Sequence, residues 1–240
     1  MNVEDNIRHI REVMAEAARR SGRPASAIRL MAVTKTVDDD RILAVIRTGV
    51  EIIGENYVQE ARRKIEKLGK AGEWHLIGRL QTNKAKYAVH LFDMIHSVDR
   101  LELATELDRR ARASGRVIPI LIEVNVSGEE SKSGVPLNAA LDLVRVAAPL
   151  ENLSVRGLMT MPPWFDDPEE SRPYFRALRN LRDKIAGEAV PRVVMRELSM
   201  GMTDDYAVAI EEGATIVRIG RGIFGQRKCD PSRVGRKEEP

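Results

Sequence analysis

The stretch Ile28-Arg-Leu-Met-Ala-Val-Thr-Lys-Thr36 is an apolar run that ends in a single lysine, and the acidic segment Val37-Asp-Asp-Asp40 follows it directly. The run predicts a short buried strand, and Val37 onward predicts the start of a helix. Because side chains alternate along a strand, Met31, Val33 and Lys35 are expected to share one face. Lys35 therefore either reaches out to water at the carboxyl end of the strand or lies in a pocket as a reactive amine.

Apolar runs alternate with amphipathic segments along the rest of the chain. After an amphipathic helix at 2–20, strands are expected at 28–35, 50–53, 73–77, 94–97, 117–126, 154–159, 196–200 and 214–219. Helices are expected at 38–48, 57–68, 81–89, 100–114, 137–147, 169–187 and 203–212. This alternation predicts the α/β class with a parallel sheet.

The number of strands distinguishes the two parallel architectures. Eight repeats in 240 residues favour a single-domain (β/α)8 TIM barrel with an extra N-terminal helix, and an open doubly wound sheet is the alternative. We expect the barrel to occupy residues 1–225. The charged segment 226–240 is expected to be a mobile tail.

Composition excludes several classes of protein. With 39 basic and 36 acidic residues mixed along the chain and only 4% aromatics, a nucleic-acid partner is not indicated. No apolar run approaches the roughly 20 residues that span a bilayer, and Met1–Arg20 lacks the apolar region of a signal peptide. The single cysteine, Cys229, excludes an internal disulfide and fits a reducing compartment. We therefore expect a cytoplasmic protein without a membrane partner.

In a barrel of this kind, the chemistry lies at the carboxyl ends of the strands. The residues expected there are polar or small: Lys35, Glu55, Asn56, Gly78, Ser97, Asp99, Asn125, Thr160, Ser199, Gly201, Arg218 and Gly220. The last two strands continue into the glycine-containing loops 199–203 and 218–222. Such loops expose backbone N–H groups to an anion, and the first leads into a helix start, so together they predict a phosphate site. Asp204 and Asp205 would repel a phosphate and are expected to face outward.

Arg218 is expected on the inward face of its strand, together with Ile216 and Gly220. A confined guanidinium keeps its proton and needs an anion, an acceptor or water. The alternative to an anionic ligand is a salt bridge with a barrel acid such as Glu123.

Three other motifs do not support a function. Gly220–Gly225 matches G-x-G-x-x-G but lacks the following helix and second strand that a dinucleotide site needs. His9, His75, His90 and His96 do not have metal-ligand spacing, so no metal is expected; His75 and His96 are interpreted as satisfied strand residues. Ser199 has no evident histidine and acid partners for a hydrolase triad.

Segments in order along the chain carry a family resemblance. They are Ala32-Val-Thr-Lys-Thr36, Gly54-Glu-Asn-Tyr-Val-Gln-Glu60, Trp74-His-Leu-Ile-Gly78, Leu80-Gln-Thr-Asn-Lys84, Ser131-Lys-Ser-Gly134, Arg156-Gly-Leu-Met159, Leu198-Ser-Met-Gly-Met202, Val217-Arg-Ile-Gly220 and Ile223-Phe-Gly225. With these segments the sequence resembles the YggS/PROSC family of pyridoxal 5′-phosphate (PLP)-binding proteins. Arg79 and Arg221-Gly222 depart from the residues that the family often has, at the rim of the site and at the phosphate loop.

The resemblance implies a barrel like the N-terminal domain of alanine racemase, with PLP held as a Schiff base on Lys35. It implies that Ser199, Gly201, Arg218 and Gly220 lie around the ring and phosphate, and Asn56 lies in one of the matching segments. Lys84 and Lys132 are the lysines to test next if Lys35 is not the amine.

The resemblance also implies a role in PLP homeostasis, in which the protein buffers the cofactor or carries it to apo PLP-dependent enzymes. We expect no efficient turnover, because an arginine on the ring nitrogen would weaken the electron sink. A racemase also needs a second acid/base, which alanine racemases take from a second domain for which this chain has no room. We therefore expect a monomer. The alternatives are a PLP-dependent amino-acid racemase and a cofactor-free Schiff-base aldolase.

Overall fold

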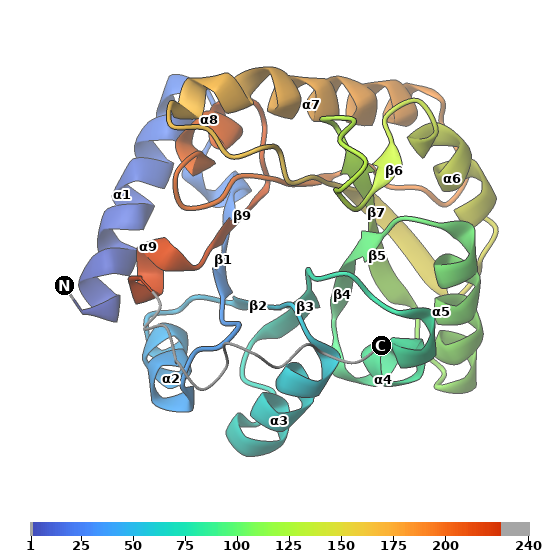
Figure 1. Ribbon diagram of the computed structural model, residues 1–240, viewed down its shortest axis with the longest axis horizontal. Coiled ribbons are helices and arrows are strands. Elements are labelled where there is room, and N and C mark those ends of the chain that lie inside the picture. The colour runs from blue at the N-terminus through green and yellow to red at the C-terminus, as the bar shows by residue number, and fades with distance from the viewer. Residues whose placement is uncertain (1, 227–240) are drawn as a thin grey trace.

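Eight parallel strands close into a barrel in the computed structural model, which describes residues 2–226. The strands are β1 (Arg29–Val33), β2 (Ile52–Glu55), β3 (Glu73–Leu76), β4 (Met94–Val98), β5 (Ile118–Asn125), β7 (Leu153–Met159), β8 (Glu197–Ser199) and β9 (Ile216–Ile219). They pair in the order β4-β3-β2-β1-β9-β8-β7-β5, and pairing of β4 with β5 closes the ring (Figure 1). The predicted TIM barrel is confirmed, and the open sheet is excluded.

Helices surround the ring of strands (Figure 1). The α-helices are α1 (Val3–Arg20), α2 (Asp39–Arg47), α3 (Val58–Leu68), α4 (Ala85–Leu91), α5 (Leu101–Ala113), α6 (Ala140–Ala147), α7 (Arg172–Gly187), α8 (Tyr206–Glu211) and α9 (Arg221–Phe224). Short 3-10 turns occur at η1 (Ala25–Ala27), η2 (Thr82–Lys84) and η3 (Pro168–Ser171). None of the described helices is long and apolar enough to cross a membrane.

The extra helix α1 lies outside the barrel, against α8, α2 and α9 (Figure 1). The side chain of Asn2 caps its start by accepting a hydrogen bond from the backbone N–H of Asp5 at 2.8 Å. Ile7, Ile10 and Met14 recur at helical spacing on the buried side. This stripe gives α1 a place in the hydrophobic core, as its sequence predicts.

The barrel separates two apolar regions. The larger core lies between the strands and the helices and includes Ala32 of β1 and Ile53 of β2. Inside the barrel, Met31, Ile52 and Ile216 form a small separate cluster. Met31 pairs with Ile52 and Arg218 in the sheet register, so the face of β1 that leads to Lys35 lines the interior.

The structure differs from the prediction at several element ends. Strand β2 begins at Ile52 rather than Val50, and α8 begins at Tyr206 rather than Thr203. A two-residue strand, β6 (Val135–Pro136), pairs with the end of β5 and was not predicted. A one-turn helix, α9, follows β9 within the G-x-G-x-x-G match, although no second strand follows it in the described residues. The predicted tail lies outside the described residues except for Gln226.

Candidate functional site

The predicted site residues meet at the carboxyl end of the barrel. Lys35 follows β1 and is half-buried, and Asn56 follows β2. Ser199 ends β8, and Arg218 lies in β9 with Gly220 directly after it. Met31 of β1 is the register partner of Arg218, and Lys35 lies in the turn that follows β1, so Lys35 and Arg218 belong to neighbouring strands at the same end of the barrel.

Arg218 is a buried cation inside the barrel. Its side chain is almost fully enclosed, with 3% exposure. Nη1 donates to the hydroxyl of Ser199 at 2.8 Å, and Nη2 donates to the backbone carbonyl of Thr160 at 2.8 Å. Burial lowers the pKa of Arg218 to about 10, so the guanidinium is still charged at neutral pH. Among the described residues it forms no salt bridge with Glu123, the alternative that its sequence context left open.

A guanidinium has five N–H donors, and these two bonds leave three of them for a ligand. Hydrogen bonds to a charged donor are roughly twice as strong as neutral ones. A ligand with acceptor atoms that entered the barrel mouth would therefore find a strong and already oriented partner.

The glycine-containing loops after β8 and β9 present further donors. Within residues 2–226, the backbone N–H groups of Gly201, Thr203 and Gly220 donate to no other group. Gly201 has φ +90°, and a Cβ atom there would lie 2.6 Å from that of Ala209. The backbone at Gly201 thus comes close to α8 in a way that only glycine permits.

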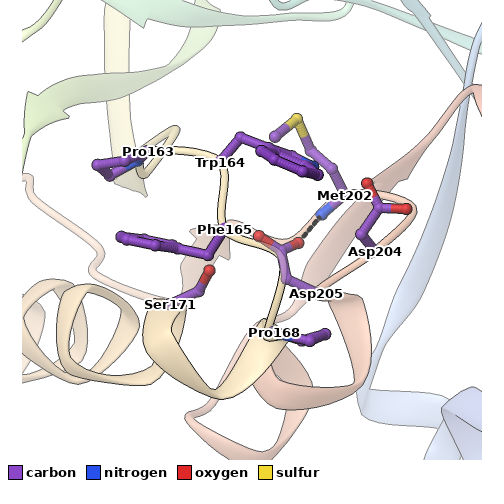
Figure 2. A pocket seen from close by; sticks show the side chains of 8 residues that line it. All are labelled: Pro163, Trp164, Phe165, Pro168, Ser171, Met202, Asp204 and Asp205. Carbon is purple, nitrogen blue, oxygen red and sulfur yellow. Dashed lines mark hydrogen bonds between the residues drawn. The ribbon is translucent and has the colours of Figure 1, made fainter.

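One of the two acids in this loop was placed wrongly. Asp204 is exposed and pairs with Arg221, which links the two loops. Asp205 is buried instead, and its carboxylate accepts the backbone N–H of Met202 at 2.6 Å (Figure 2). The predicted outward position of Asp205 is wrong because α8 begins three residues late, and the carboxylate satisfies an amide of the resulting turn.

The exit loop of β7 approaches the same turn. Trp164 and Phe165 line a small hollow beside Met202 and Asp205 (Figure 2). The hollow holds only about 20 Å³, which is about the room that one water needs. It is therefore too small for an organic ligand, although the side chain of Trp164 is 67% exposed above it.

A buried lysine holds the backbone on both sides of Lys35. Lys64 of α3 is fully buried, and its Nζ donates to the carbonyl of Thr34 at 2.5 Å and to Glu55 at 2.6 Å. It also donates to Glu60 at 2.8 Å, and Glu60 in turn accepts the backbone N–H of Thr36 at 2.6 Å. Thr36 has φ +62°, a conformation that a threonine rarely adopts. This cluster fixes the turn that carries Lys35.

Two buried oxygens near the barrel mouth lack partners. Oδ1 of Asn56 and Oε2 of Glu123 have no hydrogen-bond donor among the described residues. Burial, assisted by the charge of Asp99, raises the pKa of Glu123 to about 7. Unsatisfied buried acceptors are rare, so each of them is available to a ligand donor or a bound water.

Polar residues also line the barrel below Arg218. His75 of β3 and His96 of β4 are fully buried, and their Nδ1 and Nε2 atoms lie 3.0 Å apart. His96 Nδ1 lies 3.0 Å from the hydroxyl of Ser199. Both histidines are satisfied strand residues, as predicted, but their link to Ser199 was missed. No group of three side chains that could hold a metal ion occurs among residues 2–226.

The sequence held a signal for both missed features. Glu73 and His75 are two positions apart, so the inward face of β3 could have been identified as polar at these two residues. Lys64 follows Ala61 and Val58 at helical spacing on the buried side of α3, and a lysine on such a face needs acid partners.

Comparison with known proteins gives a consistent set of relatives. The family described as alanine racemase, N-terminal domain, matches residues 2–228. A pyridoxal phosphate homeostasis protein of Aquifex aeolicus is 46% identical over 229 residues, which cover 95% of this chain and 100% of that protein. PipY of Synechococcus elongatus, solved with PLP bound, is 34% identical with a TM-score of 0.77, over 88% of this chain and 100% of PipY.

A more distant structure shares the fold alone. Alanine racemase from Corynebacterium glutamicum is 16% identical with a TM-score of 0.71. The alignment covers 95% of this chain and 64% of that enzyme. The barrel of this chain therefore corresponds to part of the racemase.

The Lys64 cluster gives a prediction for stability. Replacing Lys64 by methionine leaves Glu55 buried without its cation, which costs about 3–5 kcal/mol in comparable cases. We expect Lys64→Met to lower the free energy of unfolding of the cofactor-free protein by that amount in urea titrations. The control is Lys67→Met on the same helix, since Lys67 is 67% exposed and pairs with Asp39 at the surface. Equal stability of the two variants would contradict the role given to the cluster.

Glu123 gives a prediction for pH dependence. Its folded pKa of about 7 lies above that of an unfolded glutamate, so folding takes up a proton between the two values and stability falls as pH rises through them. Glu123→Gln removes this titration. We expect the unfolding free energy of the parent protein, relative to the variant, to fall by about 1–3 kcal/mol between pH 5 and pH 8. Urea titrations of the cofactor-free proteins at both pH values test this, with the exposed Glu130→Gln as control. A constant difference would refute it.

Proposed function

Since the chain belongs to the family of pyridoxal phosphate homeostasis proteins, we propose that it binds PLP and holds it as a Schiff base on Lys35. The observation that supports the proposal most is that Lys35 follows β1 and the buried guanidinium of Arg218 lies on the neighbouring strand β9, at the same end of the barrel. An amine beside a fixed cation suits a ligand that is both an aldehyde and an anion. The family resemblance found in the sequence is confirmed by the relatives, of which the protein of Aquifex aeolicus is 46% identical.

The residues at the mouth fit this cofactor. Three N–H groups of Arg218 and the backbone N–H groups of Gly201, Thr203 and Gly220 are donors without a partner among the described residues. They match the phosphate and ring acceptors of PLP in kind. The buried Oδ1 of Asn56, which has no donor of its own among residues 2–226, suits a hydroxyl or a bound water.

Depth in the barrel separates the two ends of the ligand. Gly201 and Gly220 lie two residues beyond Ser199 and Arg218, past the ends of β8 and β9, and therefore nearer the rim. We place the phosphate on the rim amides and the pyridine ring over Ser199 and Arg218. Asn56 follows β2, which is separated from β9 by β1 alone. These assignments cover the six predicted residues Lys35, Asn56, Ser199, Gly201, Arg218 and Gly220.

The cofactor supplies an electron sink when it is bound. Arg218 donates hydrogen bonds and keeps its own proton, so a ring nitrogen that faces it stays unprotonated and the sink stays weak. The remaining residues orient the ligand: the cluster around Lys64 holds the Lys35 turn, and Ser199 holds Arg218. This arrangement favours retention of PLP over turnover of an amino acid, which supports a role that is not catalytic.

A racemase-like activity is the second candidate, and Glu123 is the observation that favours it. Its pKa of about 7 suits a general acid or base at neutral pH. Exchange of the α-hydrogen of amino acids into deuterated water, measured by NMR with the PLP-loaded protein, separates the two. Exchange at catalytic rates that Glu123→Gln abolishes would establish the racemase; trace exchange in both forms agrees with a binding protein.

The proposed role is PLP homeostasis. A free aldehyde condenses with any exposed amine, and a protein that holds it on one lysine buffers its concentration. We infer that apo PLP-dependent enzymes receive the cofactor, that the protein acts in the cytoplasm and that it is a monomer. Support for the location comes from the single cysteine of the sequence. Support for the monomer comes from the exposed large apolar side chains, which are scattered over different helices and loops.

Absorption spectroscopy tests the Schiff base. The parent protein mixed with PLP should show the visible band of an imine, and Lys35→Ala should lose it while retaining its fold. Lys84→Ala and Lys132→Ala are the controls and should keep the band. A full imine band in Lys35→Ala would show that another lysine is the amine.

A further inference from the structure

A line of polar side chains crosses the inside of the barrel from its amino-terminal rim to Arg218. Glu73 Oε2 lies 3.2 Å from His75 Nε2, and His75 Nδ1 lies 3.0 Å from His96 Nε2. His96 Nδ1 lies 3.0 Å from Ser199 Oγ, which accepts from Arg218 at 2.8 Å. We call these five residues the Glu73–Arg218 chain. Its three middle members are buried, and only the Glu73 end, 47% exposed, reaches solvent.

The Glu73 end sets the direction of these hydrogen bonds. The hydrogen bond from His75 and the salt bridge from Arg29 at 2.7 Å lower the pKa of Glu73 to about 2. Glu73 is therefore a carboxylate, which only accepts. His75 Nε2 must carry the proton. Because burial lowers the pKa of this ring, it is neutral, and its Nδ1 accepts.

The hydrogen bonds at the Arg218 end run in the same direction. Because His75 Nδ1 accepts, His96 Nε2 must donate to it. Burial together with nearby positive charge lowers the pKa of His96 far enough to keep this ring neutral. Its Nδ1 then accepts the hydroxyl proton of Ser199. That leaves the lone pairs of Ser199 for Arg218, which can only donate. Each of the four contacts in the chain then joins one donor to one acceptor.

We propose that this chain positions Arg218 for the bound cofactor. Ser199 and the carbonyl of Thr160 hold two nitrogens of the guanidinium, and the two histidines, both fixed as Nε2–H tautomers, keep Ser199 turned as an acceptor. Glu73, at the opposite end of the barrel, is thereby a positioning residue for the PLP site. This inference rests on the proposed function, because it assigns the chain a role toward PLP.

A purely structural role would make a different prediction. Buried polar groups need partners in any protein, and a chain that only satisfies them would affect stability but not the cofactor. The distinguishing quantity is therefore the affinity for PLP in a folded variant with the chain altered at its exposed end. Glu73 is suitable because its side chain is half in solvent and its loss leaves no buried charge.

The first measurement needs no cofactor. In the 15N-labelled cofactor-free protein at pH 7, the ring nitrogen shifts of His75 and His96 should both show a protonated Nε2 and a bare Nδ1. The exposed rings of His9 and His90 serve as references. A protonated Nδ1 on either buried histidine would overturn the direction of the chain, and with it the proposal.

The second measurement compares Glu73→Leu with Glu51→Leu. Both glutamates pair with Arg29, at 2.7 and 3.9 Å, but only Glu73 contacts His75. We expect Glu73→Leu to weaken PLP binding by about threefold to tenfold and to mix the tautomers of His75, with Glu51→Leu unchanged. Ser199→Ala should weaken PLP binding at least as much.

The outcomes separate the two claims. Unchanged PLP affinity in folded Glu73→Leu would overturn the positioning role and leave the proposed function intact. Failure of the parent protein to bind PLP would overturn the proposed function and the positioning role together, whereas the NMR result decides the direction of the chain independently.

Discussion

A permanent positive charge lies inside the barrel at Arg218, and much of the surrounding structure serves to satisfy it. Taking a guanidinium out of water is costly unless acceptors replace the water. The barrel supplies two of them, the hydroxyl of Ser199 and the carbonyl of Thr160, each at 2.8 Å. The hydroxyl is held in turn by His96 and His75. The remaining N–H groups of Arg218 are left for an acceptor from outside.

A second buried cation, Lys64, organises the end of the neighbouring strand β1. Lys64 ties the carbonyl of Thr34 directly and the N–H of Thr36 through Glu60. The peptide groups on either side of Lys35 are thereby fixed before any ligand arrives. Preorganisation of this kind lowers the entropic cost of binding. The two buried cations thus have complementary roles: Arg218 is available to the ligand, and Lys64 holds the backbone of the residue that we assign to the Schiff base.

The fold could be predicted because each strand is a short apolar run followed by a helix signal, and alternation placed Met31 and Arg218 on the inward face. Short-range patterns did not predict contacts between distant strands. His96 meets Ser199 across 103 positions of sequence, and Asp205 is buried because α8 begins later than its sequence indicates. The site residues were found where they are both polar and at strand ends. Glu73 and Lys64 were missed because their roles also depend on long-range contacts: His75 meets His96 across 21 positions, and Lys64 meets the carbonyl of Thr34 across 30.

The central claim is that Lys35, and no other lysine, carries the cofactor. Reduction of the PLP-loaded protein with borohydride converts the Schiff base to a stable secondary amine, and peptide mass mapping then locates it. We expect one phosphopyridoxyl group per chain, on the peptide that contains Lys35. Its stoichiometric presence on Lys84, Lys132 or a mixture of surface lysines would show that Lys35 does not carry the Schiff base.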